Sequence, residues 1–145
     1  MKTAATIIVL ASLILGSSSN ATTNPKENIQ IKENTIETLL MGLNSDNIGL
    51  KSSSAYMIGE LKLSEGVIPL LKILHNEENE ELRISAALAL YKIGTPIAIY
   101  AVKQAIKFDD SERVSKLCAN FYGEFLKNKL NDEELNNDAV MTALK

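Results

Sequence analysis

The chain has 145 residues, with 15 basic and 18 acidic side chains and a net charge of −3. This acidic balance disfavours nucleic acid and anionic lipid as partners, because both are usually bound through basic patches. The single cysteine, Cys118, excludes an intramolecular disulfide, so the packing of its elements must stabilise the fold.

The first 21 residues have the pattern of a secretory signal peptide. Lys2 precedes an apolar run at residues 4–15, and small residues follow up to Ser19-Asn20-Ala21, which fits a cleavage site. An uncleaved membrane anchor is the alternative. However, the apolar run of about 12 residues is shorter than the roughly 20 that a spanning helix needs. We therefore expect cleavage after Ala21, no stable membrane insertion afterwards, and a periplasmic or secreted bacterial protein.

Cleavage would remove one lysine and no acid, leaving a mature chain with a net charge of 14 − 18 = −4. Residues 22–33 are polar and include Pro25, so they predict a flexible N-terminal segment with little to bury.

From Asn34 onward the pattern of apolar residues is helical. Six helices are expected, at residues 34–43, 47–61, 65–75, 80–93, 96–108 and from about 111 to about 130. Gly94 should end the fourth helix and Pro96 should open the fifth. The expected N-terminal caps are Asn34 in a capping box with Glu37, Ser45 or Asp46, Ser64, Asn79, Thr95, and Asp110 or Ser111. No stretch alternates as a strand does, so the fold class is all-α.

Three segments superimpose at a spacing of 32 residues, and each is typical of the second helix of a helix pair. They begin at Leu50, Leu82 and Val114, and Ala55, Ala87 and Ala119 fall in register. One such pair cannot bury its own apolar face, so neighbouring pairs must stack to form a core. The sequence therefore predicts a short right-handed α-solenoid of about three helix pairs, at residues 34–63, 64–94 and 95–126.

The middle pair resembles a HEAT repeat. It has Ile68-Pro69 in the first helix, an acidic turn, Leu82-Arg83, paired alanines Ala86-Ala87 and a closing Ile93-Gly94. The resemblance covers roughly residues 34–126 and implies an α-solenoid that binds other molecules. The HEAT-like phycobilin lyases share such repeats, so the resemblance does not determine an activity.

The resemblance also implies a ladder of acids in the turns and bases at the start of the second helices. Asp46 with Lys51, Glu77 with Arg83, and Asp109 stand in those places, and the charges can pair within and between repeats. The third repeat departs from the pattern, with Ser115 in the position of the base and Arg113 two residues earlier. The ladder is therefore expected to stop there.

The sequence offers little for catalysis. His75, the only histidine, stands at a helix C-terminus, where it is expected to cap the helix. Cys118 aligns with Ser54 and Ala86, at positions of small residues, and is expected to lie in the core rather than act as a nucleophile. The acids Glu77, Glu78, Glu80 and Glu81 lack the spacing of an EF-hand loop, and they favour the start of a helix instead. We predict no catalytic residue, no metal site and no cofactor.

The side of the second helices opposite the core is the most informative surface. In HEAT-like stacks these helices line the concave face, and here that face carries apolar or amphipathic residues where a purely solvated one would be charged. The residues predicted to contact a protein partner are Tyr56, Ile84, Leu88, Lys92, Lys116 and Asn120. The apolar ones could instead pack sideways between repeats.

The tail at residues 127–145 is expected to form a loose capping helix over the last repeat, with a partner-binding or disordered end as alternatives. The favoured function is an exported, non-catalytic scaffold that binds another protein and is itself a monomer. The alternatives are a lyase-like enzyme or accessory subunit, and a structural subunit of an envelope assembly that uses the ends of the stack as contact surfaces.

Overall fold

A computed structural model describes the backbone of residues 33–143 and the side chains of residues 33–136. The expected leader at 1–21 and nearly all of the expected segment at 22–33 lie outside the described residues. The elements, in chain order, are α1 (Glu33–Leu43), α2 (Ile48–Glu60), the 3₁₀ turn η1 (Ser64–Gly66), α3 (Val67–Asn76), α4 (Glu80–Ile93), α5 (Pro96–Phe108) and α6 (Glu112–Ala143). No strand occurs in this range, so the all-α prediction is confirmed.

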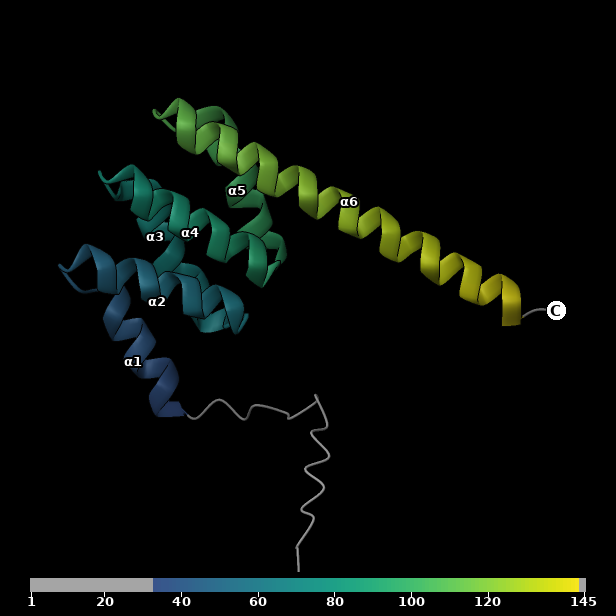
Figure 1. Cartoon of the computed structure of the whole chain (residues 1–145), viewed down its shortest axis with the longest axis horizontal. Coiled ribbons are helices and arrows are strands. Elements are labelled where there is room, and N and C mark those ends of the chain that lie inside the picture. Colours follow the sequence, from purple (N-terminus) through teal and green to yellow (C-terminus); the bar gives the residue numbers. More distant parts are fainter. Residues whose placement is uncertain (1–32, 144–145) are drawn as a thin grey trace, which may run out of the picture. The chain divides into compact units, whose positions relative to one another are not determined.

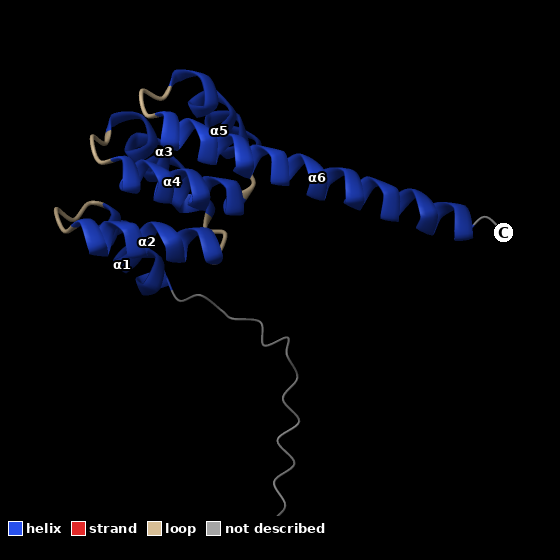
Figure 2. Ribbon diagram, turned by 45° about the horizontal axis from the view of Figure 1, so that its top comes forward, coloured by secondary structure: helices blue, strands red, loops and turns tan. Residues whose placement is uncertain are grey.

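The helices form three stacked pairs. α2, α4 and α6 lie side by side in one layer with α4 in the middle, and α1, α3 and α5 form a second layer behind them (Figure 1). Figure 2 shows the same two layers from another direction. The second helix of each pair contacts the second helix of the next, which is the arrangement of a short α-solenoid.

Most helix ends follow the local sequence signals. The Asn79 side chain accepts hydrogen bonds from the backbone of Glu81 and Leu82, and Gly94 ends α4 with φ of 71°, which favours glycine. Ser111 caps α6, because its Oγ accepts a bond from the Val114 amide at 3.3 Å.

Several predicted caps are wrong. Asn47, rather than Ser45 or Asp46, caps α2, since its side chain accepts from the Leu50 amide at 2.9 Å. Ser45 instead accepts from the Asn47 amide, so it orders the turn just before the helix. α1 already begins at Glu33, which places Asn34 inside the helix rather than at its cap.

The predicted caps of α3 and α5 also differ from the structure. Ser64 lies inside η1, and Gly66 precedes α3 without a side-chain capping bond. Thr95 stands at the N-cap of α5 as predicted, but its side chain makes no capping hydrogen bond.

The core is built from the residues that the 32-residue register aligns. Buried positions recur in the second helices, and the first helices contribute their own aligned residues; examples are Ala55, Ile58, Leu70, Leu74, Leu82, Ala87, Leu90, Val102 and Val114. Three aligned residues that the helical spacing places on the buried side are exposed: Leu50 is 51% and Met57 42% exposed, and Ala119 is exposed as well. They belong to the first and last repeats, which have no further repeat to cover them.

Neighbouring second helices approach closely at Gly59. A Cβ atom added there would lie 2.7 Å from the Cα of Ala89, so the backbone of α4 occupies the space a side chain would need. Gly123 holds the same position in the third repeat, two periods later, and a Cβ added there would meet nothing within 4 Å. The same residue type is therefore sterically required in α2 and free in α6.

We expect Gly59→Ala to destabilise the protein by about 1–3 kcal/mol, because α4 must move away from α2. Gly123→Ala is the matched control, and it should stabilise by up to about 1 kcal/mol because alanine is the better helix former. Urea unfolding followed by circular dichroism would measure both. Equal effects of the two substitutions would contradict the close packing at Gly59.

The tail continues α6 instead of folding back. α6 runs without a break from Glu112 to Ala143, so the expected separate capping helix over the last repeat is a wrong prediction. No glycine or proline interrupts residues 124–143, and Lys129 pairs with Glu133 one turn on. Figure 2 shows α6 running on well past the end of α4.

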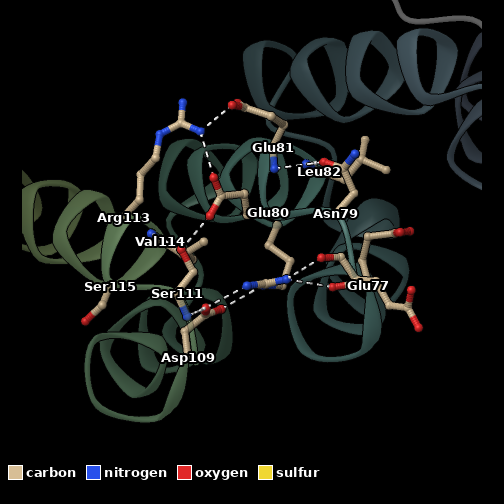
Figure 3. A network of polar contacts seen from close by, with 12 residues as sticks. Glu77, Asn79, Glu80, Glu81, Leu82, Asp109, Ser111, Arg113, Val114 and Ser115 are labelled. Atoms are coloured by element: carbon tan, nitrogen blue, oxygen red, sulfur yellow. Dashed lines mark hydrogen bonds and ion pairs between the residues drawn. The ribbon is translucent and has the colours of Figure 1, made fainter.

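The polar ladder runs between repeats. Arg83 of the second repeat forms a bidentate ion pair with Asp109 of the third, at 2.8 and 2.9 Å (Figure 3). Its remaining guanidinium nitrogen donates to the carbonyl groups of Glu77 and Glu78. Lys51 of the first repeat pairs with the Glu77 carboxylate at 2.9 Å. Each base therefore reaches the acid of the following repeat.

The expected pairs within a repeat are not found: Lys51 pairs with Glu77 rather than with Asp46, and only the carbonyl of Glu77, not its carboxylate, binds Arg83. The predicted stop at Ser115 agrees with the structure, since the Ser115 hydroxyl donates to the Ile106 carbonyl. Arg113 compensates in part by pairing backward with Glu80 and Glu81 of the second repeat.

The Arg83–Asp109 pair is largely removed from water, with side chains 13% and 5% exposed. Burial acts to raise the pKa of Asp109. However, hydrogen bonds from Arg83 and the Ser111 amide outweigh it, so this pKa lies below its usual value. A carboxylate of this kind stabilises the fold above its unfolded-state pKa, and this stabilisation is lost as the pH falls through the folded-state pKa.

We expect Asp109→Ala to lower the free energy of unfolding by about 3 kcal/mol at pH 7, because it leaves the Arg83 charge without its carboxylate partner. The difference from wild type should begin to shrink below about pH 4, where the carboxylate of the unfolded state becomes protonated, and should shrink further as the pH falls toward the lower folded-state pKa. Urea unfolding at pH 7 and pH 3 would test this, and a difference that is the same at both pH values would contradict it.

Candidate functional site

The two candidate reactive side chains lie in different environments. Cys118 is fully buried in the core, where burial, together with the charge of Asp109, raises the pKa of its thiol to about 11. His75 is exposed in the last turn of α3 and lines a cavity of about 560 Å³ beside Phe108 and Asp109. Cys118 does not line this cavity, so the structure does not bring the two side chains together there.

Cys118 should resist modification in the folded protein. A thiol with a pKa of about 11 is almost entirely protonated at neutral pH, and only the thiolate reacts. We expect labelling by a disulfide reagent at pH 7.5 to be at least about a hundredfold slower in the native protein than in denaturant. Rapid stoichiometric labelling of the native protein would contradict the buried position.

Most of the acid cluster before and at the start of α4 is bound by cations of neighbouring repeats. A hydrogen bond from Lys51 lowers the pKa of Glu77, and hydrogen bonds from Ser111 and Arg113 lower that of Glu80. Glu81 also pairs with Arg113 (Figure 3). Among residues 33–136, whose side chains the structure describes, no group of three or more His, Cys, Asp or Glu side chains is arranged to hold a metal ion. The cluster therefore joins the second repeat to its neighbours.

A groove on the outer face of the second-helix layer brings together two of the six predicted contact residues. It has a volume of about 340 Å³ and lies between α2 and α4; its lining residues are Ser52, Ser53, Tyr56, Met57, Ser85 and Leu88. Tyr56 is 50% exposed and Leu88 is partly buried. A hydrogen bond of 2.9 Å between the hydroxyl groups of Ser52 and Ser85 joins the two helices beside the groove.

Lys92 supports the groove from its side. Its ammonium group lies 4.7 Å from the centre of the Tyr56 ring and also pairs with Glu60. The hydrogen bond that Lys92 donates to Glu60 raises the pKa of Lys92, which further favours its charged form. The ion pair with Glu60 therefore holds the Lys92 ammonium group beside the Tyr56 ring.

The other three predicted contact residues do not line the groove. Ile84 is partly buried and packs against the core, which agrees with the alternative that apolar residues of this face pack between repeats. Lys116 is exposed and pairs with Glu112 at 2.7 Å, and Asn120 is exposed on α6. The groove is therefore confined to the first and second repeats.

Sequence reasoning missed Met57, Ser53 and Ser85 as groove residues. Met57 aligns with Ala89 and Phe121, and the helical spacing of these positions placed it on the side expected to be buried. Ala89 is buried and Phe121 packs against the core, as that spacing predicts. No second helix of an earlier repeat precedes α2 among the described residues. The place of Met57 in the first repeat was therefore the signal that could have identified it as a groove residue.

The comparison with protein families agrees with this geometry. A family model for HEAT repeats matches residues 36–120. The chain belongs to the HEAT-repeat family. HEAT-repeat domains generally serve as protein-interaction scaffolds. No curated protein matches the chain. In residues 33–143, no helix is both long and apolar enough to cross a bilayer.

Proposed function

We propose that this HEAT-repeat chain is an exported, non-catalytic scaffold that binds another protein through the groove around Tyr56. The groove is the observation that carries the proposal. It combines an exposed aromatic ring and a methionine with serine hydroxyl groups, on the layer of second helices. Tyrosine is enriched among residues that dominate binding energy.

The shape of the groove favours an apolar side chain of the partner, inserted between Tyr56 and Leu88. Ser53 is exposed and can donate a hydrogen bond to the partner's backbone. Lys92 and Glu60 neutralise each other at the rim, so this pair does not select for a strongly charged partner. The proposed ligand is therefore a protein surface with a protruding aliphatic or aromatic residue.

Export rests on the sequence of residues 1–21. A bacterial periplasmic location also fits a chain that has one buried cysteine and no disulfide to form. The intact mass of C-terminally tagged protein recovered from the envelope fraction tests this part of the proposal. Export with cleavage predicts the loss of residues 1–21, and retention of the leader in a cytoplasmic protein would contradict it.

The groove can be tested with a double variant, Tyr56→Ala/Leu88→Gln, used as bait against an envelope fraction. Tyr100→Ala is the matched control, because Tyr100 is also an exposed tyrosine but lies on α5 in the other layer. Loss of a central tyrosine costs about 2 kcal/mol, so the double variant should lose about thirtyfold or more of its affinity for specific partners, measured by quantitative mass spectrometry and then by titration. Identical partner lists for the wild type and both variants would remove the groove from the proposal.

A further inference from the structure

The two ends of the stack expose faces that the interior repeats bury. On α2 the outward face consists of Leu50, Ser53 and Met57, spaced as neighbours on one side of a helix; we call it the leading face. On α6 the outward face contains Ala119 and Gly123; we call it the trailing face. Terminal repeats of solenoids usually carry a polar outer surface, whereas two of the three residues of the leading face, Leu50 and Met57, are apolar.

The register between repeats shows what each face is shaped to contact. The equivalents of Leu50 and Met57 in the second repeat, Leu82 and Ala89, are 2% and 1% exposed, and Ala89 packs against Gly59 of α2. The surface of α2 that receives Ala89 includes Gly59, and the buried Ala55 lies one turn before it; their equivalents in α6 are Gly123 and Ala119. The trailing face of α6 therefore has the same residue types as the part of α2 on which α4 packs. α4 makes that contact through Ala89, its equivalent of Met57 on the leading face.

The side chains are complementary in size at this register. At the contact between α2 and α4, Gly59 leaves room for the backbone of Ala89. At the contact between α4 and α6, the equivalent residues are Tyr91 and Phe121, which stack with ring centres 5.8 Å apart. A contact between α6 and α2 of a second copy, in the same register, would place Met57 of that copy against Gly123. A Cβ added at Gly123 would have no neighbour within 4 Å. The long, adaptable methionine side chain then faces the position with the most free space.

Charge also distinguishes the two ends. α1, the first helix of the leading repeat, carries Glu33 and Glu37 and no basic residue. α5, the first helix of the trailing repeat, carries Lys103 and Lys107 and no acid, and both lysines line a groove of about 410 Å³ together with Tyr122. In the same register, Glu124 of one copy would lie near Glu60 of the next copy. Each acid already pairs with a lysine of its own chain, Glu124 with Lys127 and Glu60 with Lys92. Opposite charges on α1 and α5 favour contact between unlike ends and disfavour contact between two leading ends.

We propose that the chain binds a second copy of itself head to tail, with the leading face of one copy packed on the trailing face of the next. In this arrangement α2 of the second copy packs beside α6 of the first copy, as α4 packs beside α2 within one chain. The layer of second helices therefore continues from one copy into the next. This replaces the sequence-based expectation of a monomer. It does not depend on the proposed function of the Tyr56 groove, although Met57 borders both surfaces.

A head-to-tail contact uses two different faces and leaves one of each free, so it does not close into a dimer by itself. Sedimentation velocity of the purified wild type should therefore show an average mass that rises with concentration and does not level off at two copies. Met57→Glu, which alters the leading face, and Gly123→Glu, which alters the trailing face, should each weaken association by about tenfold or more.

The mixture of the two variants is the decisive measurement. Met57→Glu keeps an intact trailing face and Gly123→Glu keeps an intact leading face, so an equimolar mixture should form a one-to-one dimer and nothing larger. Ile68→Glu is the matched control, because it places the same charge at an exposed apolar position of α3, away from both faces, and it should associate as wild type does.

Thermal unfolding would first establish that each variant is folded. Both substituted positions are open to solvent or have free space, and Leu50→Gln with Ala119→Gln provides a second pair on the same faces. The proposal is overturned if wild type stays monomeric at the highest concentration reached, or if all variants associate equally. It is also overturned if Gly123→Glu associates normally while Met57→Glu does not and mixing restores nothing, since that result indicates pairing of two leading faces.

Discussion

Gly59 allows α2 to lie against the backbone of α4, and the contacts between the first two repeats depend on that close approach. It brings Ser52 within hydrogen-bond reach of Ser85 and places Glu60 beside Lys92. The groove that presents Tyr56 exists because two second helices lie at this separation, with small side chains between them. A bulkier residue at Gly59 would move α4 outward and change the floor of the groove, even though Gly59 does not line it.

The sequence predicted the scaffold well because its period constrains it. Residues that must be buried between two helices recur every 32 positions, and Ala87, Leu82 and Val114 are buried as the register requires. Charged pairs were harder to assign, because the distance between an acid and a base along the chain does not show which repeat each contacts. Lys51 pairs with Glu77, 26 residues away, and not with Asp46, which is only five positions from it.

The candidate site was predicted only in part, for two physical reasons. An apolar residue at a repeated position is buried only if another repeat covers it, so Met57 becomes a groove residue at the end of the array. Ile84 shows the converse, because it packs against the core from a position assigned to the outer face. The tail was missed because residues 127–143 have a composition that suits a solvated helix as well as a loose cap, and only the unbroken backbone of α6 separates the two.

The direction of the ion-pair ladder bears on how such an array could lengthen. The middle repeat, residues 64–94, contains both Glu77, which receives Lys51, and Arg83, which reaches forward to Asp109. A tandem duplication of this segment would supply each new base with an acid and each new acid with a base, and would leave no buried charge unmatched. A repeat added after residue 126 would instead follow Ser115 and find no cation to pair with its turn acid. Gene duplication could therefore extend this protein from its centre more readily than from its end.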